Sequence, residues 1–165
     1  MTDTTTDTPQ NYILYRTMPS GWQVKGFVIA AMQLTASQAI DPPPGFSYLL
    51  DADTKCPVGS IYAPSTDYTL TGDTTAIAGT PVTLTLTPGG SGPQADVTVT
   101  LSDGGAGGTF SSGTITFGAG STAAQTVTYT PKAAGTVIIS TTNNGGLTDP
   151  ASLVVTVSAA AAAAS

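Results

Sequence analysis

Apolar and hydroxylated residues alternate one by one through the second half of the chain. In residues 80–88 Val82, Leu84 and Leu86 alternate with threonines, and residues 95–103 repeat the pattern. Shorter stretches of the same kind cover 113–117, 125–131 and 152–159. Because side chains of a β-strand point alternately to two faces, this period predicts strands with one buried and one solvated face.

Two further strands complete this set. The sequence TVIIS at 136–140 is apolar at successive positions, which predicts a central strand buried on both faces. DYTLTG at 67–72 predicts a first edge strand. Glycine-rich turn segments separate the strands at intervals of about 8–12 residues, a rhythm that is typical of a β-sandwich.

The first part of the chain has a less regular pattern. Residues 11–16 and 22–32 predict a hairpin around a Pro-Ser-Gly turn. Residues 32–40, MQLTASQAI, could form a short helix, which the three prolines of 41–45 would stop. A strand is expected to resume at FSYLLDAD, 46–53.

Composition changes near residues 62–66, where aromatic residues and cations become rare. We therefore divide the chain into an N-terminal arm and attachment module (1–64), a β-sandwich (65–159) and an alanine-rich tail (160–165). The expected fold class is all-β, with a β-sandwich preceded by a small, mostly β docking module that carries an extended arm.

Charge narrows the classes of function. The 165 residues include 10 acids, 4 cations and no histidine, for a net charge of −6. Four scattered cations cannot neutralise a run of phosphates, so we expect no nucleic-acid binding. The polar, acidic start is not a secretory signal. The apolar run of 26–32 is too short to span a bilayer, so we expect no membrane insertion. We expect the protein to be assembled in the cytoplasm.

The glycine-rich segment SDGGAGGTF, 102–110, raises the question of a phosphate cradle. A P-loop needs a lysine and a following helix, and here neither occurs. The segment is therefore interpreted as a loop between two strands.

No catalytic arrangement is evident. Without histidine there is no Ser-His-Asp or Cys-His set, and Cys56, beside Lys55, is interpreted as a small apolar core residue. We expect no enzymatic activity and no cofactor.

Aspartates suggest two candidate calcium sites. Asp51 and Asp53 lie two apart on an expected strand, with Asp41 nearby in the sequence, and Asp103 and Asp149 could meet at one end of the sandwich. Turn aspartates that cap backbone N–H groups are the favoured alternative, so no metal is assigned.

The one feature of the sequence that suggests partner binding is a set of aromatic and large apolar residues in the first module. These are residue types that anchor protein interfaces, although they could equally form the module's own core. The partner-binding hypothesis comprises Tyr12, Tyr15, Trp22, Phe27, Phe46, Tyr48 and Leu49.

The sequences LSDGGAGGTFSSGTITF and VTYTPKAAGTVIISTTNNGGLTDPASLVVTV resemble immunoglobulin-like domains of tailed-bacteriophage virion proteins and bacterial surface proteins. The resemblance covers 66–159 and implies that the fold is an all-β, immunoglobulin-like β-sandwich, although this segment has neither the antibody cysteine pair nor a buried tryptophan. It implies a virion structural protein, either a head decoration or a tail fibre, whose partners are capsid or tail proteins and sister subunits. Weak binding of host-surface glycans stays open.

Two other classes of protein remain as alternatives. The first is a bacterial surface or secreted adhesion module with an immunoglobulin-like domain. The second is a polysaccharide-degrading tail enzyme, for which the sequence offers no catalytic cleft.

Overall fold

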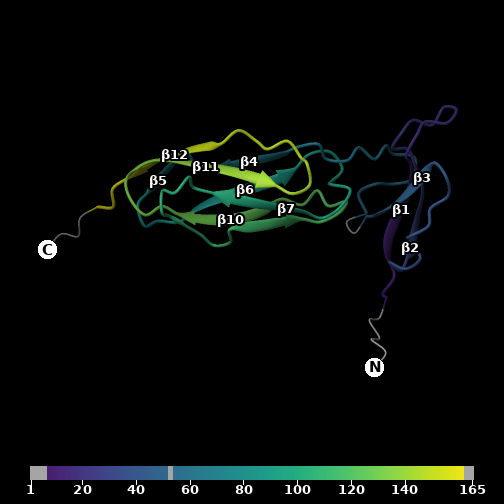
Figure 1. The fold of residues 1–165 in the computed structure, drawn as a ribbon, viewed down its shortest axis with the longest axis horizontal. Coiled ribbons are helices and arrows are strands. Elements are labelled where there is room, and N and C mark those ends of the chain that lie inside the picture. Colours follow the sequence, from purple (N-terminus) through teal and green to yellow (C-terminus); the bar gives the residue numbers. More distant parts are fainter. Residues whose placement is uncertain (1–6, 52–53, 162–165) are drawn as a thin grey trace, which may run out of the picture.

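The structure is a computed structural model that describes residues 7–51 and 54–161. It is all-β, with a three-stranded sheet at one end of an elongated molecule and a two-sheet sandwich along the rest (Figure 1). The described residues contain no helix long and apolar enough to cross a membrane.

The sandwich consists of a four-stranded sheet, β4-β6-β10-β8, facing a five-stranded sheet, β5-β12-β11-β7-β9. The order β4-β6-β10 against β12-β11-β7 is the A-B-E and G-F-C order of an immunoglobulin-like domain. This confirms the expected all-β class and the immunoglobulin-like sandwich, whereas residues 1–6 of the expected arm lie outside the described residues. The strands are β4 (Tyr68–Gly72), β5 (Thr75–Ile77), β6 (Val82–Pro88), β7 (Val97–Ser102), β8 (Thr109–Phe110), β9 (Thr114–Phe117), β10 (Gln125–Thr130), β11 (Gly135–Asn143) and β12 (Leu153–Ser158).

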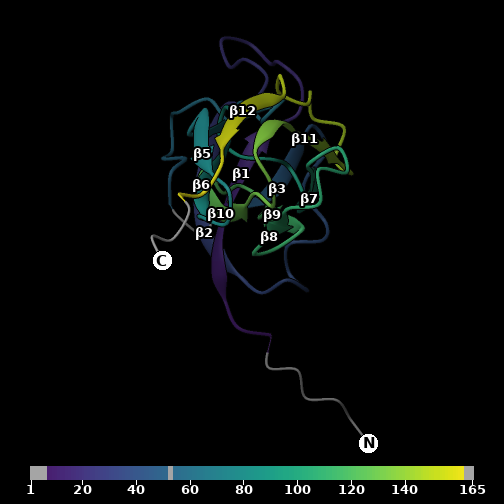
Figure 2. The same cartoon turned by 90° about the vertical axis from the view of Figure 1, so that its left-hand side faces the viewer.

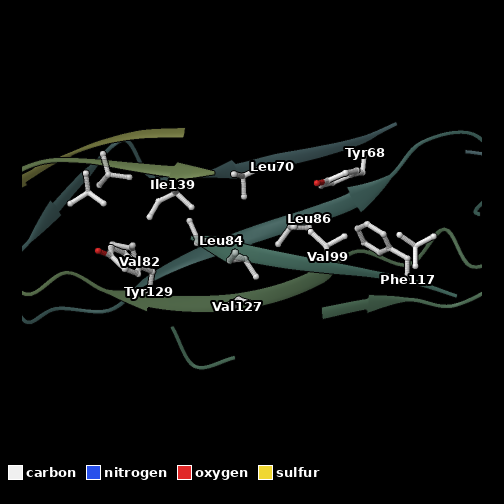
Figure 3. Close-up of a cluster of buried hydrophobic side chains, with 14 of the residues drawn as sticks. Tyr68, Leu70, Val82, Leu84, Leu86, Val99, Phe117, Val127, Tyr129 and Ile139 are labelled. Atoms are coloured by element: carbon white, nitrogen blue, oxygen red, sulfur yellow. The ribbon is translucent and has the colours of Figure 1, made fainter. Parts of the chain in front are cut away.

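The predicted alternation builds the core between these sheets (Figure 3). On β6, Val82, Leu84 and Leu86 point inward, and the intervening threonines point outward. The aromatic rings of Tyr68 and Phe117 meet edge to face across the two sheets, with centroids 5.7 Å apart. The local period of two is therefore sufficient to identify the buried positions.

The prediction for residues 136–140 is only half right. The segment lies in β11, which is central between β12 and β7. However, Ile138 is 53% exposed, because the outer face of this sheet is open to solvent. Ile138 pairs with the equally exposed Val154.

The N-terminal sheet has the order β2-β1-β3, with β1 at Gln10–Arg16, β2 at Val28–Leu34 and β3 at Phe46–Leu50. The predicted hairpin pairs β1 with β2 and has a bulge at Leu14/Tyr15. Its connection is longer than predicted, because β2 begins only at Val28; the tight turn, closed by Ser20 and Gln23, uses Gly21 of the predicted Pro-Ser-Gly together with Trp22.

The prediction of a short helix at 32–40 is wrong. Its first three residues complete β2, and a single helical turn follows. The Thr35 N–H bonds the Gln38 side chain, as in a capping box, and Asp7 accepts the N–H groups of Ala36 and Ser37. The turn ends there because the prolines after Asp41 cannot continue a helix.

The segment between the module and the sandwich is bonded along its length. The Ser91 N–H donates to Ala63 O at 2.8 Å, the Ser65 N–H to Gly92 O at 2.9 Å, and the Tyr62 hydroxyl to the same carbonyl at 3.2 Å. Gly120 of the sandwich also packs against the Leu50 carbonyl. The boundary segment at 62–66 is therefore held against the sandwich, while the division at 64 and 160 stays a prediction.

Candidate functional site

The structure distributes the seven predicted anchor residues over three environments. Tyr15 and Leu49 are buried, at 6% and 4% exposure. Tyr12, Phe46 and Tyr48 are half-buried on the opposite face of the sheet. Trp22 is 79% exposed and contacts the half-buried Phe27. The set therefore divides between core and surface, and the surface part is the candidate site.

Tyr15 and Leu49 belong to a cluster between the sheet and the sandwich, which we call the inner cluster. It consists of Ile13, Tyr15, Val28, Leu49, Cys56 and Tyr62. The rings of Tyr15 and Tyr62 meet edge to face at 5.0 Å, and Ala119 of the sandwich packs on the cluster. The module thus uses the end of the sandwich to complete its core.

The other face of the sheet is also apolar, but it is not free. Because β2 and β3 both run antiparallel to β1, residues 35–45 must cross from one end of the sheet to the other. Figure 1 shows this segment on the side of the sheet that faces away from the sandwich. Leu14 on this face is accordingly only 8% exposed.

Trp22 lies at the tip of a projecting loop, residues 17–26, which we call the finger. Ser20 and Gln23 close it with two backbone hydrogen bonds of 2.9 and 3.1 Å. The Arg16 guanidinium lies 4.6 Å from the centroid of the Phe46 ring, and its Nε donates to the Gln23 side chain. The finger is therefore braced from its base to its turn.

The finger is apolar and positively charged. Met18 and Val24 are 59% and 47% exposed beside the tryptophan, and Lys25 is exposed. Between Thr8 and Ile40 the sequence contains no acid. The sequence analysis identified Trp22 but did not predict that exposed apolar residues and Lys25 cluster around it. The acid-free stretch could have indicated this cluster.

The first candidate calcium site does not form around Asp51. This carboxylate is 4% exposed and accepts the N–H groups of Lys55 and Cys56 at 2.9 and 3.1 Å. It therefore acts as a turn cap, which was the favoured alternative. Asp53 lies outside the described residues.

The second candidate calcium site is wrong. Asp103 bonds the Tyr129 hydroxyl and Asp149 bonds the Tyr68 hydroxyl, at 3.1 and 2.7 Å. Tyr129 pairs with Val82 and Tyr68 with Pro88, so the two aspartates lie at opposite ends of β6, about 20 Å apart. No group of three metal-binding side chains occurs in the part of the chain that the structure describes.

The glycine-rich loop after β7 is organised by Asp103. Its carboxylate accepts the N–H groups of Gly105 and Gly108 at 3.0 and 2.8 Å. A Cβ on Gly108 would lie 2.2 Å from the Tyr129 hydroxyl, so only glycine fits there. The segment is a strand connection, as its lack of a lysine predicted.

Replacing Asp103 by asparagine is expected to lower stability by about 1–2 kcal/mol at pH 7. Burial raises the pKa of Asp103, but the N–H groups of Gly108 and Gly105 and the Tyr129 hydroxyl outweigh burial and lower it. Because the folded pKa is depressed, this stabilisation is present above pH 4 and is lost as the pH falls through the folded pKa.

Urea unfolding at pH 7 and pH 3 tests this prediction. The difference between wild type and Asp103→Asn should shrink at the lower pH. Asp41→Asn, at an exposed aspartate, serves as the control. A difference that does not change with pH would contradict the assignment.

Cys56 is expected to be unreactive in the folded protein. It is 5% exposed. Burial raises the pKa of its thiol, and the Asp51 carboxylate raises it further, against a lowering hydrogen bond from Ser91. Since the thiolate is the reactive form, labelling by a disulfide reagent at pH 8 should be at least about tenfold slower than in urea. An introduced Ile138→Cys in a Cys56→Ala background is the exposed control, and equal labelling rates would contradict the prediction.

Comparison with known proteins identifies no family. No family model matches the chain, and no curated protein is similar to it. Among solved structures, the D00-D0 domain of intimin matches at 14% sequence identity and a TM-score of 0.41, over 92% of this chain and 87% of that one.

Proposed function

We propose that the chain is a non-enzymatic attachment and display protein. Its N-terminal module docks on a larger protein assembly, and the immunoglobulin-like sandwich extends away from that contact. The observation that carries this proposal is the braced finger with Trp22 at its tip, 79% exposed, at the end of the molecule opposite strand β5 (Figure 1).

The physical reason is the free energy of burying an indole. Tryptophan is enriched among the residues that dominate the binding energy of protein interfaces. A loop that is already rigid, such as the finger, loses little conformational entropy on binding. The bonded junction between module and sandwich supports display, because it transmits the position of the docked module to the sandwich.

The sandwich resembles immunoglobulin-like domains of both phage virion proteins and bacterial surface proteins, so this function has two candidate locations. In a tailed-bacteriophage virion, the module would bind capsid or tail proteins and sister subunits, and the sandwich would serve as a decoration or fibre element. On a bacterial surface, the same protein would be an adhesion module. Antibody detection on density-purified particles, compared with intact cells that carry no prophage, separates the two.

Deleting residues 1–64 tests the docking role in either setting. The sandwich alone, with its folding checked by its unfolding transition, should no longer join particles or cell surfaces. A deletion that leaves incorporation at the wild-type level would overturn the proposed function.

A further inference from the structure

A groove lies at the far end of the sandwich, opposite the N-terminal module. It has a volume of about 460 Å³, and we call it the far groove. Its lining includes Asp73, Ala76, Ile77, Thr80, Pro81 and Ser158. Figure 2 views the molecule from this end, with β5 and β12 in front and the module behind. The groove is within the range of pockets that enclose small ligands, about 300–1,000 Å³, and an indole fits that size.

Hydrogen bonds hold the far groove in shape. The Ala78 N–H donates to Ser158 O at 2.9 Å and the Thr80 N–H to Ile77 O at 3.0 Å. The edge strand β5 pairs in parallel with β12 through Thr75, Ala76 and Ile77. Little ordering is therefore required for a ligand to bind, which lowers the entropic cost of association.

The chemistry of the far groove complements that of the finger. Ile77 offers an apolar wall that is 49% exposed, and the exposed Asp73 supplies a negative charge. Lys132, the cation at this end, has its side chain against Gly107 of the neighbouring loop. The finger carries the matching pair, the exposed indole of Trp22 and the ammonium group of the exposed Lys25.

We propose that the finger of one copy docks in the far groove of the next, with Trp22 against Ile77 and Lys25 beside Asp73. The occupant of the groove is thus a second copy of this chain. The inference rests on the proposed function only in treating the finger as a docking element, and it deepens that function by naming a partner.

The position of the two surfaces decides the kind of assembly. Finger and far groove lie at opposite ends of an elongated molecule, so the contact is head to tail. Such a heterologous contact leaves a free finger and a free groove on every pair, and it repeats into a chain of subunits unless the rotation closes a ring. This geometry favours a stacked fibre over an isolated decoration.

Sedimentation of the purified full chain over a range of concentrations tests the inference, with tryptophan emission as a second measurement. Trp22 is the one tryptophan of the sequence, so the emission reports on the finger alone. We expect concentration-dependent association accompanied by a blue shift. Trp22→Ala should weaken association by about 30-fold or more, as for an interface hot spot.

A charge exchange makes the test specific. Lys25→Asp and Asp73→Lys should each abolish association, because each places like charges at the contact. A mixture of the two variants should restore it, since each finger then meets an oppositely charged groove. Lys55→Asp, which makes the same charge change at another exposed lysine of the module, should have no effect.

Three results would overturn the inference: a monomer at every concentration, association without a change in Trp22 emission, or a mixture that fails to associate. Each leaves the proposed function to its own test, because module-dependent attachment to particles or cells does not require contact between copies. Wild-type attachment after deletion of residues 1–64, with head-to-tail association of the full chain observed, would instead overturn the proposed function alone.

Discussion

Replacing Tyr129 by alanine is expected to lower the free energy of unfolding by about 3–5 kcal/mol. The side chain is fully buried in the core of the sandwich (Figure 3). The centroid of its ring lies 4.7 Å from that of the Phe110 ring. Removing it would leave a cavity that the surrounding β-strands cannot close, because their backbones are fixed by ladder hydrogen bonds.

A second variant separates the ring from its hydroxyl. Burial, together with Asp103, raises the pKa of Tyr129 to about 12, so the hydroxyl stays protonated and donates at neutral pH. Tyr129→Phe removes only this bond and should cost about 1 kcal/mol. Urea unfolding measures both, and Thr128→Ala on the exposed face should stay within about 0.5 kcal/mol of wild type. A loss for Tyr129→Ala no larger than that for Tyr129→Phe would show that the ring packs less tightly than the structure indicates.

Replacing Gly120 by valine is expected to push the N-terminal module away from the sandwich. Gly120 has a φ of 69°, and a Cβ there would lie 2.2 Å from the Leu50 carbonyl oxygen. A left-handed backbone costs a non-glycine residue about 1–2 kcal/mol, and overpacking costs about 1–3 kcal/mol more. We therefore expect a loss of about 2–5 kcal/mol in the free energy of unfolding.

Limited proteolysis and unfolding together measure the effect. The segment 62–66 should be cleaved faster in Gly120→Val, because its bonds to residues 89–92 loosen when the module moves. Gly113→Val is the matched control, since its Cβ would meet no atom within 4 Å. If both variants behave like the wild type, the module does not rest on Gly120.

The predictions for Tyr129 and Gly120 concern two parts of the molecule, and the sequence predicts the first part better than the second. The strands of the sandwich follow from a period of two, which depends on neighbours in the chain. The alternation alone therefore identifies positions such as Leu84 and Val99 as buried, and both are. It does not reveal the contact at Gly120, because that contact joins segments far apart in the sequence.

The candidate site shows the same limit. Composition identifies the aromatic residues of the module, but it cannot tell Tyr15 from Trp22. Tyr15 lies on the sheet face that meets the sandwich, whereas Trp22 lies in a turn that the structure directs outward. Which residues of the module are buried depends on where the sandwich packs against it, and no local sequence pattern predicts that position.

The sequence by itself determined the all-β class, the longer strands of the sandwich, the loop within 102–110 and the acid-free stretch around the finger. These depend on residue type and local periodicity. Only the tertiary structure decided that Asp103 and Asp149 lie at opposite ends of a strand, and that residues 35–39 stop after one helical turn. It also decided that the exposed Trp22 and the far groove occupy the two ends of the molecule. The reason is that each of these depends on the path of the chain through space, which is set by packing between segments far apart in the sequence.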